Sequence, residues 1–172
     1  MKKLNVILKS DNIDYVEISK ELIDDYLEMV NNPDINKLIS GKEKYFSYDD
    51  EINWINNKLE EKAIIFSMIE RKTGNFIGNV EFMNVTEKNA EIGISITKDY
   101  QNKHYGTETL RTMIDFGFNR LGLEEINLIV FSHNLRAIHC YKNLGFAEYK
   151  TVENVRIVDG EPVNDIYMKL KK

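Results

Sequence analysis

Proline, cysteine and long apolar runs are all scarce in this chain of 172 residues. Two prolines and nine glycines argue against a low-complexity or disordered protein. The one cysteine, Cys140, cannot form an intramolecular disulfide, so nothing in the sequence requires an oxidising compartment. No apolar run approaches the ~20 residues that cross a bilayer, and the first residues lack the apolar stretch of a signal peptide. We therefore expect a soluble, cytoplasmic protein with no membrane partner.

The chain also lacks an excess of basic residues. Its formal net charge is −5, with 30% charged and 42% hydrophobic residues. Such a balance is ordinary for a globular protein, disfavours nonspecific nucleic-acid binding and is compatible with a cationic substrate. We expect no nucleic-acid partner. The length suits one domain spanning residues 1–172, because no repeat, linker or shift in composition divides it.

Hydrophobic periodicity predicts a mixed α/β fold. Runs with strand character are separated by turn residues in the middle and at the end of the chain, whereas apolar residues at helical spacing dominate elsewhere. We expect about seven strands and about four helices. The expected strands cover residues 4–8, 63–69, 76–85, 90–97, 126–131, 146–158 and 163–170, the last two joined by a turn at 159–160. The expected helices cover residues 19–30, 47–59, 110–121 and 134–144, with a short helical region near 35–39 ended by Gly41.

A polar turn, residues 101–107, joins the expected strand 90–97 to a helix. Backbone N–H groups at the start of a helix carry the positive end of its dipole and bind phosphate oxygens well. The turn therefore predicts a pyrophosphate site, although a plain solvated loop fits the same residues. The two phosphate motifs with strong spacing, Gly-x-x-x-x-Gly-Lys-Ser/Thr and Gly-x-Gly-x-x-Gly, are absent, which excludes nucleotide triphosphatases and dinucleotide oxidoreductases.

The helix 134–144 carries a second set of candidate residues. Asn134 is a good N-cap, and Ala137 and Tyr141 lie at i and i+4 on one helical face. Gly145 suits the left-handed position that ends a helix. Taken singly, Asn134 is explained by capping and Tyr141 by core packing.

Together these residues resemble the GNAT superfamily of acetyl-CoA-dependent N-acetyltransferases, and the resemblance covers essentially the whole chain. The helix matches that superfamily's second motif, and the turn matches its phosphate loop. Glu91-Ile92-Gly93 is similar to the branch of ribosomal-protein alanine and spermidine N-acetyltransferases. The matching segments are Gln101-x-x-His104-x-Gly106 and Asn134-x-Arg136-Ala137-Ile138-x-x-Tyr141-x-x-Leu144-Gly145-Phe146.

The resemblance implies a central, mostly antiparallel sheet with a splayed parallel pair of strands at the cofactor site. It implies acetyl-CoA as co-substrate and acetyl transfer to a primary amine. The amine would attack the thioester directly in a ternary complex. A metal site is not expected, because the three histidines have no carboxylate or cysteine partners at metal-ligand spacing. A homodimer is a possible assembly.

The resemblance also assigns roles to residues. The edge of the strand near residue 95 would pair with the pantetheine amides, and the turn would hold the pyrophosphate. Tyr141 would protonate the departing thiolate, since a phenol of pKa ~10 stays protonated at neutral pH. The implied cofactor-binding residues are Ile94, Ser95, Ile96, Gln101, Asn102, Lys103, His104, Tyr105, Gly106, Thr107, Asn134, Ala137 and Tyr141.

An alkylammonium must lose a proton before it attacks, so the reaction needs a base. Glu91, directly or through a water molecule, is our candidate, and an exposed strand glutamate is the plain alternative. Glu81 on the preceding strand competes for the role. The acceptor could be a polyamine, a protein N-terminus or another small-molecule amine. A non-catalytic acyl-CoA-binding module for sensing or assembly is the alternative function.

His104 departs from the family pattern, because it stands where the first loop glycine is usual. Glycine permits a positive φ and a close approach of the backbone. Histidine is among the non-glycine residues enriched in the left-handed region, so the loop can still close around it. Gly106 and Thr107 remain in the loop, and we expect His104→Gly to keep or improve the affinity for acetyl-CoA.

Overall fold

The computed structural model describes residues 3–40, 44–158 and 160–172. Its chain forms two compact units. Unit 1 comprises Met1–Phe82 and Gly93–Thr109, and unit 2 comprises Met83–Ile92 and Leu110–Lys172. The predicted helix end at Gly41 and the Asp159 half of the predicted last turn lie outside the described residues.

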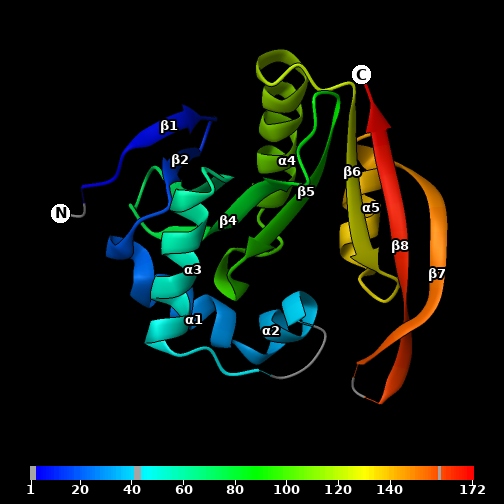
Figure 1. The fold of residues 1–172 in the computed structure, drawn as a ribbon, viewed down its shortest axis with the longest axis horizontal. Helices are drawn as coiled ribbons and strands as arrows, with labels where there is room; N and C mark the ends of the chain where they lie inside the picture. Colours follow the sequence, from blue (N-terminus) through cyan, green and yellow to red (C-terminus); the bar gives the residue numbers. More distant parts are fainter. Residues whose placement is uncertain (1–2, 41–43, 159) are drawn as a thin grey trace. The chain divides into compact units, whose positions relative to one another are not determined.

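Unit 1 begins with a strand hairpin, followed by three helices and a second hairpin (Figure 1). The strand β5 starts in unit 2 and ends in unit 1, where a short 3₁₀ turn, Lys98–Tyr100, leads into α4. The elements are β1 (Val6–Lys9), β2 (Ile13–Glu17), α1 (Ile23–Asn31), α2 (Pro33–Ser40), α3 (Tyr48–Glu60), β3 (Ile64–Glu70), β4 (Phe76–Met83), β5 (Asn89–Ile96) and α4 (Tyr105–Asp115).

Unit 2 contains the end of α4, which continues as a π-helical turn over Phe116–Arg120, and the last strands of the chain. Figure 1 shows β6, β8 and β7 side by side in yellow to red, in agreement with their antiparallel ladders. The elements are β6 (Glu125–Phe131), α5 (Leu135–Asn143), β7 (Ala147–Val158) and β8 (Glu161–Lys171). No described helix is long and apolar enough to span a membrane.

The strands follow the order β1-β2-β3-β4-β5-β6-β8-β7. The β1–β2, β2–β3, β3–β4, β6–β8 and β7–β8 pairs are antiparallel, whereas β5 and β6 are parallel. The parallel ladder joins Asn89–Glu91 to residues 125–127, and each strand continues beyond it. The predicted mixed fold with a parallel pair is confirmed.

The predicted element count was too low. The described residues form eight strands and five α-helices, and the strand missed by the sequence analysis is β2. Ile13, Tyr15 and Val16 in β2 are buried, and the strand pairs with both β1 and β3. Its five residues follow a polar turn at Ser10–Asn12, so the alternation of Ile13, Asp14 and Tyr15 was the signal available.

The core of unit 1 lies under α1, α2 and α3. Helix α3 begins with a capping box in which Ser47 and Asp50 satisfy each other's backbone N–H groups, which fixes where the helix starts. Tyr26 of α1 is fully buried, and its ring meets Trp54 and Phe76 edge to face. The buried cluster comprises Val16, Ile18, Leu22, Ile23, Tyr26, Met29, Ile35, Ile55, Ile65, Ile69 and Phe76.

A close approach of two strands fixes the end of β5 that leads to the predicted phosphate loop. A Cβ added at Gly78 of β4 would lie 2.0 Å from the Ser95 carbonyl oxygen of β5. Nearby, the Thr97 N–H donates to the Ile77 carbonyl at 2.8 Å. Only glycine lets the two backbones come this close, so Gly78 sets the position of the chain that enters the loop.

Candidate active site

The loop after β5 contains two non-glycine residues with positive φ. Asn102 and His104 both adopt left-handed conformations, with φ of 59° and 67°. His104 thus adopts the left-handed conformation that glycine would permit at this position, which histidine tolerates better than most residues. Helix α4 follows at once, and its Glu108 N–H donates to the His104 carbonyl at 3.0 Å. Left-handed residues beside a helix start turn successive N–H groups inward, as in anion-binding nests.

The loop is packed against the end of β5. The Gln101 side-chain amide donates to the Ile96 carbonyl at 3.0 Å, and a Cβ added at Gly106 would lie 3.2 Å from Cδ1 of Ile96. Ile94 and Ser95 are half-buried one or two residues earlier on the strand. The lack of a side chain at Gly106 and the positive helix terminus suit a phosphate. The unit 1 residues thus fit the pyrophosphate of acetyl-CoA.

Helix α5 carries the unit 2 candidates. Asn134 caps the helix, because its side-chain oxygen accepts from the Ala137 N–H at 3.3 Å. At the other end, Gly145 has φ +93° and the Phe146 N–H donates to the Tyr141 carbonyl at 3.0 Å. Both predicted helix ends are confirmed.

Tyr141 is half-buried in the last turns of α5. Its ring centroid lies 5.9 Å from that of Phe146, with the planes at 64°. Burial raises the pKa of the Tyr141 hydroxyl to about 12, with a smaller contribution from Cys140. The phenol is therefore fully protonated at neutral pH and is available as a proton donor.

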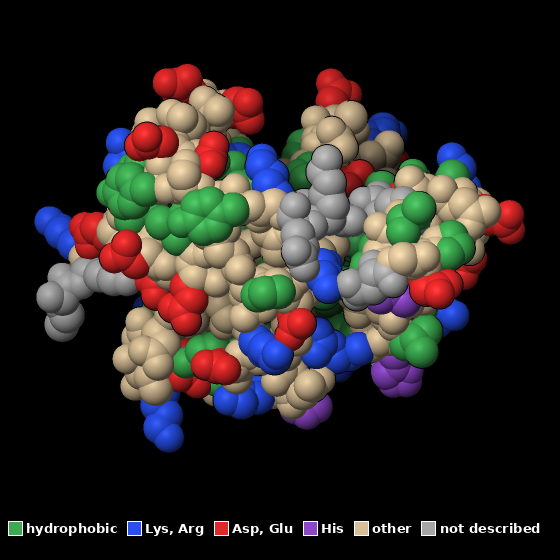
Figure 2. All heavy atoms as spheres, turned by 90° about the horizontal axis from the view of Figure 1, so that it is seen from below, with side chains coloured by type: hydrophobic (Ala, Val, Ile, Leu, Met, Phe, Trp, Pro, Cys, Tyr) green, Lys and Arg blue, Asp and Glu red, His purple; other side chains and the backbone are tan. Residues whose placement is uncertain are grey.

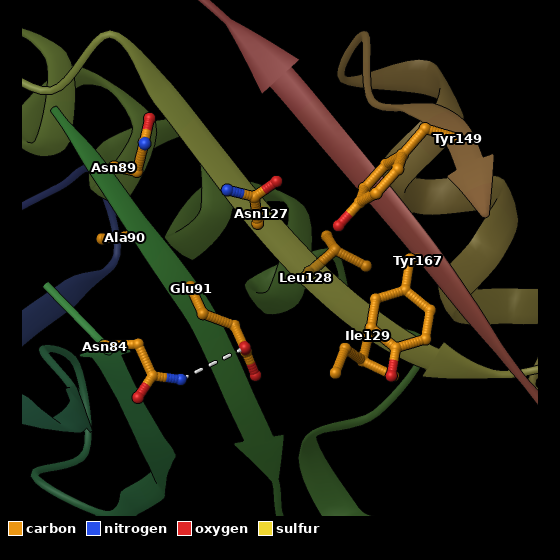
Figure 3. A pocket seen from close by; sticks show the side chains of 9 residues that line it. All are labelled: Asn84, Asn89, Ala90, Glu91, Asn127, Leu128, Ile129, Tyr149 and Tyr167. Atoms are coloured by element: carbon orange, nitrogen blue, oxygen red, sulfur yellow. Dashed lines mark hydrogen bonds between the residues drawn. The ribbon is translucent and has the colours of Figure 1, made fainter. Parts of the chain in front are cut away.

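Glu91 lines a pocket of about 220 Å³ that lies wholly within unit 2. The strand alternation predicted for this segment is confirmed, since Ala90 and Ile92 are buried while Glu91 lies on the other face. Figure 3 shows its carboxylate reaching toward Asn84, whose side-chain amide donates to it at 3.4 Å. The lining residues are Asn84, Asn89, Ala90, Glu91, Asn127, Leu128, Ile129, Tyr149 and Tyr167.

Two tyrosines from the last strands form the opposite side of this pocket in Figure 3. The ring centroids of Tyr149 and Tyr167 are 6.2 Å apart, and burial, followed by the charge of Glu125, raises the pKa of Tyr149. A lysine ammonium group of this chain also lies over each ring. Lys169 Nζ lies 4.9 Å from the Tyr149 centroid, and Lys150 Nζ lies 5.0 Å from the Tyr167 centroid.

The sequence analysis did not select these tyrosines. Both lie on strands that the sequence predicts without assigning a function to their residues. Strand β7 also has a register irregularity between Glu148 and Lys150. A shift of one residue moves a side chain to the other face of a strand. Tyr149 therefore could not be placed beside Tyr167 by counting along the sequence.

Glu81, the competing candidate base, is engaged elsewhere. Its carboxylate forms an ion pair with Lys58 of α3 at 2.5 Å, and both side chains are about a quarter exposed or less. The Glu81 carboxylate therefore already has an ammonium partner within unit 1. Glu91 has a neutral amide as its hydrogen-bond donor instead.

Histidine and cysteine chemistry has little support in the described part of the chain. No group of three metal-ligating side chains is found among residues 3–40, 44–158 and 160–172. The His139 Nε2 atom contacts the Asn143 amide at 2.9 Å, and the His133 ring lies beside that of Phe131. Cys140 is a half-buried cysteine in the thiol form.

Comparisons with known proteins agree with this arrangement. Residues 15–147 match the acetyltransferase (GNAT) domain family. A spermidine N(1)-acetyltransferase of Vibrio cholerae is 28% identical over 151 residues, which cover 85% of this chain and 84% of that protein. An L-amino acid N-acetyltransferase of Escherichia coli is 33% identical over 79 residues, which cover 46% of this chain and 49% of that protein.

The fold is shared as well. The crystal structure of the Vibrio cholerae spermidine N-acetyltransferase in complex with CoA and spermine has a TM-score of 0.85 at 22% identity, covering 94% of this chain and 96% of that chain. The family match spans most of the chain, from β2 to the start of β7. The chain therefore belongs to the GNAT family and is an acetyl-CoA-dependent N-acetyltransferase.

Proposed function

We propose that the protein transfers the acetyl group of acetyl-CoA to a primary amine of a small alkyl polyamine that binds in the Glu91 pocket. The observation that carries this proposal is the charge of the lining. Glu91 is the one formally charged side chain among the nine lining residues, and three asparagines add carbonyl oxygens. Carboxylates and carbonyl oxygens are acceptors for ammonium groups, which carry donors alone.

The aromatic side of the pocket supports the same class of acceptor. Tyr149 and Tyr167 already hold the ammonium groups of Lys169 and Lys150 at cation–π distance. These contacts show that the ring faces attract ammonium groups, and a ligand ammonium would compete with the two lysines for them. The similarity to spermidine N-acetyltransferases over most of the chain also favours a polyamine over a protein N-terminus or an amino acid.

The reaction proposed for this pocket begins with deprotonation of the acceptor ammonium. Glu91, directly or through a water molecule, takes the proton of the acceptor ammonium, and the free amine attacks the thioester carbonyl in a ternary complex. A C–N bond forms and the C–S bond breaks. Tyr141, protonated at neutral pH, donates its proton to the departing sulfur, and the second proton of the amine nitrogen restores the phenol as the amide forms.

Acetyl-CoA supplies the activated acetyl group when bound. In unit 1, the residues 101–107 would hold its pyrophosphate, and the edge of β5 near Ser95 would pair with its pantetheine amides. In unit 2, Asn134 and Ala137 would contact the pantetheine arm. We propose that residues 1–172 act together as one acetyltransferase domain.

A thiol-release assay with acetyl-CoA and a panel of amines tests the acceptor. The panel contains linear di- and polyamines, L-amino acids, aminoglycosides and peptides with free N-termini. We expect saturable release with the linear polyamines at the lowest KM, and an acetylated amine as product. Preference for an amino acid would contradict the charge argument, and CoA binding without release on any amine would contradict catalysis.

A further inference from the structure

We infer that Glu70 is a positioning residue that holds the two ends of the phosphate loop together before acetyl-CoA binds. Glu70 ends β3, far in sequence from the loop that it contacts. Tyr100 and Tyr105 flank the loop residues 101–104, and both hydroxyls reach this one carboxylate. We call these three residues the Glu70 clasp. The inference builds on the proposed role of residues 101–107.

The three residues of the Glu70 clasp all belong to unit 1. The Tyr105 hydroxyl donates to Glu70 Oε1, and the Tyr100 hydroxyl donates to Glu70 Oε2 at 3.4 Å. The two rings also meet edge to face, with centroids 5.5 Å apart and planes at 63°. The two ends of the loop are thus held together in two ways, by packing of the Tyr100 and Tyr105 rings and by their hydrogen bonds to the Glu70 carboxylate.

The carboxylate itself is held in place by the β3–β4 turn. The Thr73 hydroxyl donates to Glu70 Oε2, and the Asn75 side-chain amide donates to the Tyr100 hydroxyl at 3.1 Å. The hydrogen bond from Thr73, followed by that from Tyr105, lowers the pKa of Glu70. The hydrogen bond to Glu70 raises the pKa of Tyr105 to about 12. Both directions are those of charge-assisted hydrogen bonds to an ionised carboxylate.

The loop needs such a support because its backbone is strained. Asn102 and His104 are non-glycine residues at φ 59° and 67°. Conformations of this kind persist where the surrounding structure holds them. Lys103, between them, lies with its ammonium 5.4 Å from the Tyr100 ring centroid, so the same ring that reaches Glu70 also holds the middle of the loop.

The sign of one effect separates positioning from simple electrostatics. A carboxylate close to an anion-binding loop repels phosphate, so removal of its charge should tighten CoA binding if charge alone matters. If Glu70 positions the loop, its removal should weaken binding, because only the fraction of molecules with a closed loop binds well. Glu70→Gln therefore has opposite predicted effects under the two explanations.

The first experiment measures the clasp without any ligand. Amide hydrogen exchange of residues 100–107 is compared in the free wild-type protein, Glu70→Gln and Tyr105→Phe. Tyr105→Phe keeps the ring and the Glu70 charge and removes one hydroxyl. We expect faster exchange in the loop in both variants, with exchange in β3 and β4 unchanged. Unchanged loop exchange in both variants would overturn the inference, whatever the loop binds.

The second experiment measures the affinity for CoA by calorimetry. We expect a Kd about tenfold weaker for each variant, as when the closed fraction falls to about one tenth. The double variant should be no weaker than the worse single variant, because both substitutions act on the same hydrogen bond between Tyr105 and Glu70. Glu87→Gln, which removes an exposed carboxylate from the β4–β5 turn, is the charge control and should bind like wild type.

The outcomes keep the two proposals apart. An unchanged or tighter Kd in Glu70→Gln would overturn positioning by Glu70. Failure of CoA to protect residues 101–107 from exchange in the wild-type protein would instead contradict the proposed role of the loop. At saturating acetyl-CoA, kcat and the acceptor KM of Glu70→Gln should stay within about threefold of wild type, because the closed fraction changes affinity and not chemistry.

Discussion

Tyr141→Phe removes one oxygen atom from α5 and leaves the ring that packs on Phe146. With a pKa of about 12, the Tyr141 phenol is ionised in about one molecule in 10⁵ at pH 7, so the donor form is always present. A thiol has a reference pKa of ~8.5, which is about 3.5 units lower. Proton transfer to a free thiolate is therefore uphill, so Tyr141 donates its proton while the C–S bond breaks and charge develops on the sulfur, rather than after the thiolate has formed.

General acid catalysis contributes typically 10²–10⁴-fold, and the high pKa of Tyr141 places it at the lower end. We therefore expect kcat of Tyr141→Phe to fall about 100-fold, or about 2.7 kcal/mol in the barrier, with the Kd for CoA changed less than threefold. Steady-state thiol release with a polyamine and calorimetric CoA binding measure the two quantities. An unchanged kcat, or a loss that appears only in Kd, would refute the role of Tyr141 as acid.

Three further substitutions test separate parts of the account. His104→Gly should keep or improve CoA affinity in calorimetry, because glycine adopts φ 67° without strain; a large loss would mean that the imidazole itself contacts the cofactor. Gly78→Ala should lower the free energy of unfolding by about 1–3 kcal/mol in urea, because the new methyl group would lie 2.0 Å from the Ser95 oxygen; full stability would show that β4 and β5 separate easily. Tyr149→Leu should raise the KM of a polyamine about threefold and leave kcat similar, because an exposed cation–π contact contributes about that much to binding. An unchanged KM would show that Tyr149 is not part of the acceptor site.

Local sequence signals were sufficient for much of this fold. Asn134 and Gly145 determine the ends of α5 through capping and a left-handed φ, and both effects involve residues that are neighbours in sequence. The positive φ of His104 is consistent with the tolerance of histidine for this conformation, which left closure of the loop possible. Strand β2 was missed because five residues give a weak periodic signal, and burial between β1 and β3 decides its conformation.

Contacts between distant segments could not be read from the sequence. Glu70 meets Tyr105 across 35 positions, and Tyr149 meets Tyr167 across a strand pair with an irregular register. The sequence likewise left open whether Glu81 or Glu91 is the base, because the alternation of side chains along the strands is compatible with either residue. The structure distinguishes them by the ion pair of Glu81 with Lys58 and by the pocket that Glu91 lines.

The distribution of charge on the surface does not identify the acceptor site. Acidic and basic side chains both appear on the face drawn in Figure 2, so the net charge of −5 does not mark one binding site there. The charge that matters to the proposal is local, and it belongs to Glu91 in a pocket lined otherwise by neutral side chains.

The most direct test of the proposed chemistry is therefore kcat/KM for a linear polyamine in a matched pair of variants, Glu91→Gln and Glu81→Gln. Each removes one carboxylate from a neighbouring strand and keeps its size. We predict a loss of about 100-fold in Glu91→Gln and a loss of less than threefold in Glu81→Gln, with the Kd for CoA unchanged in both. An active Glu91→Gln, or an equal loss in Glu81→Gln, would contradict deprotonation of the amine by Glu91.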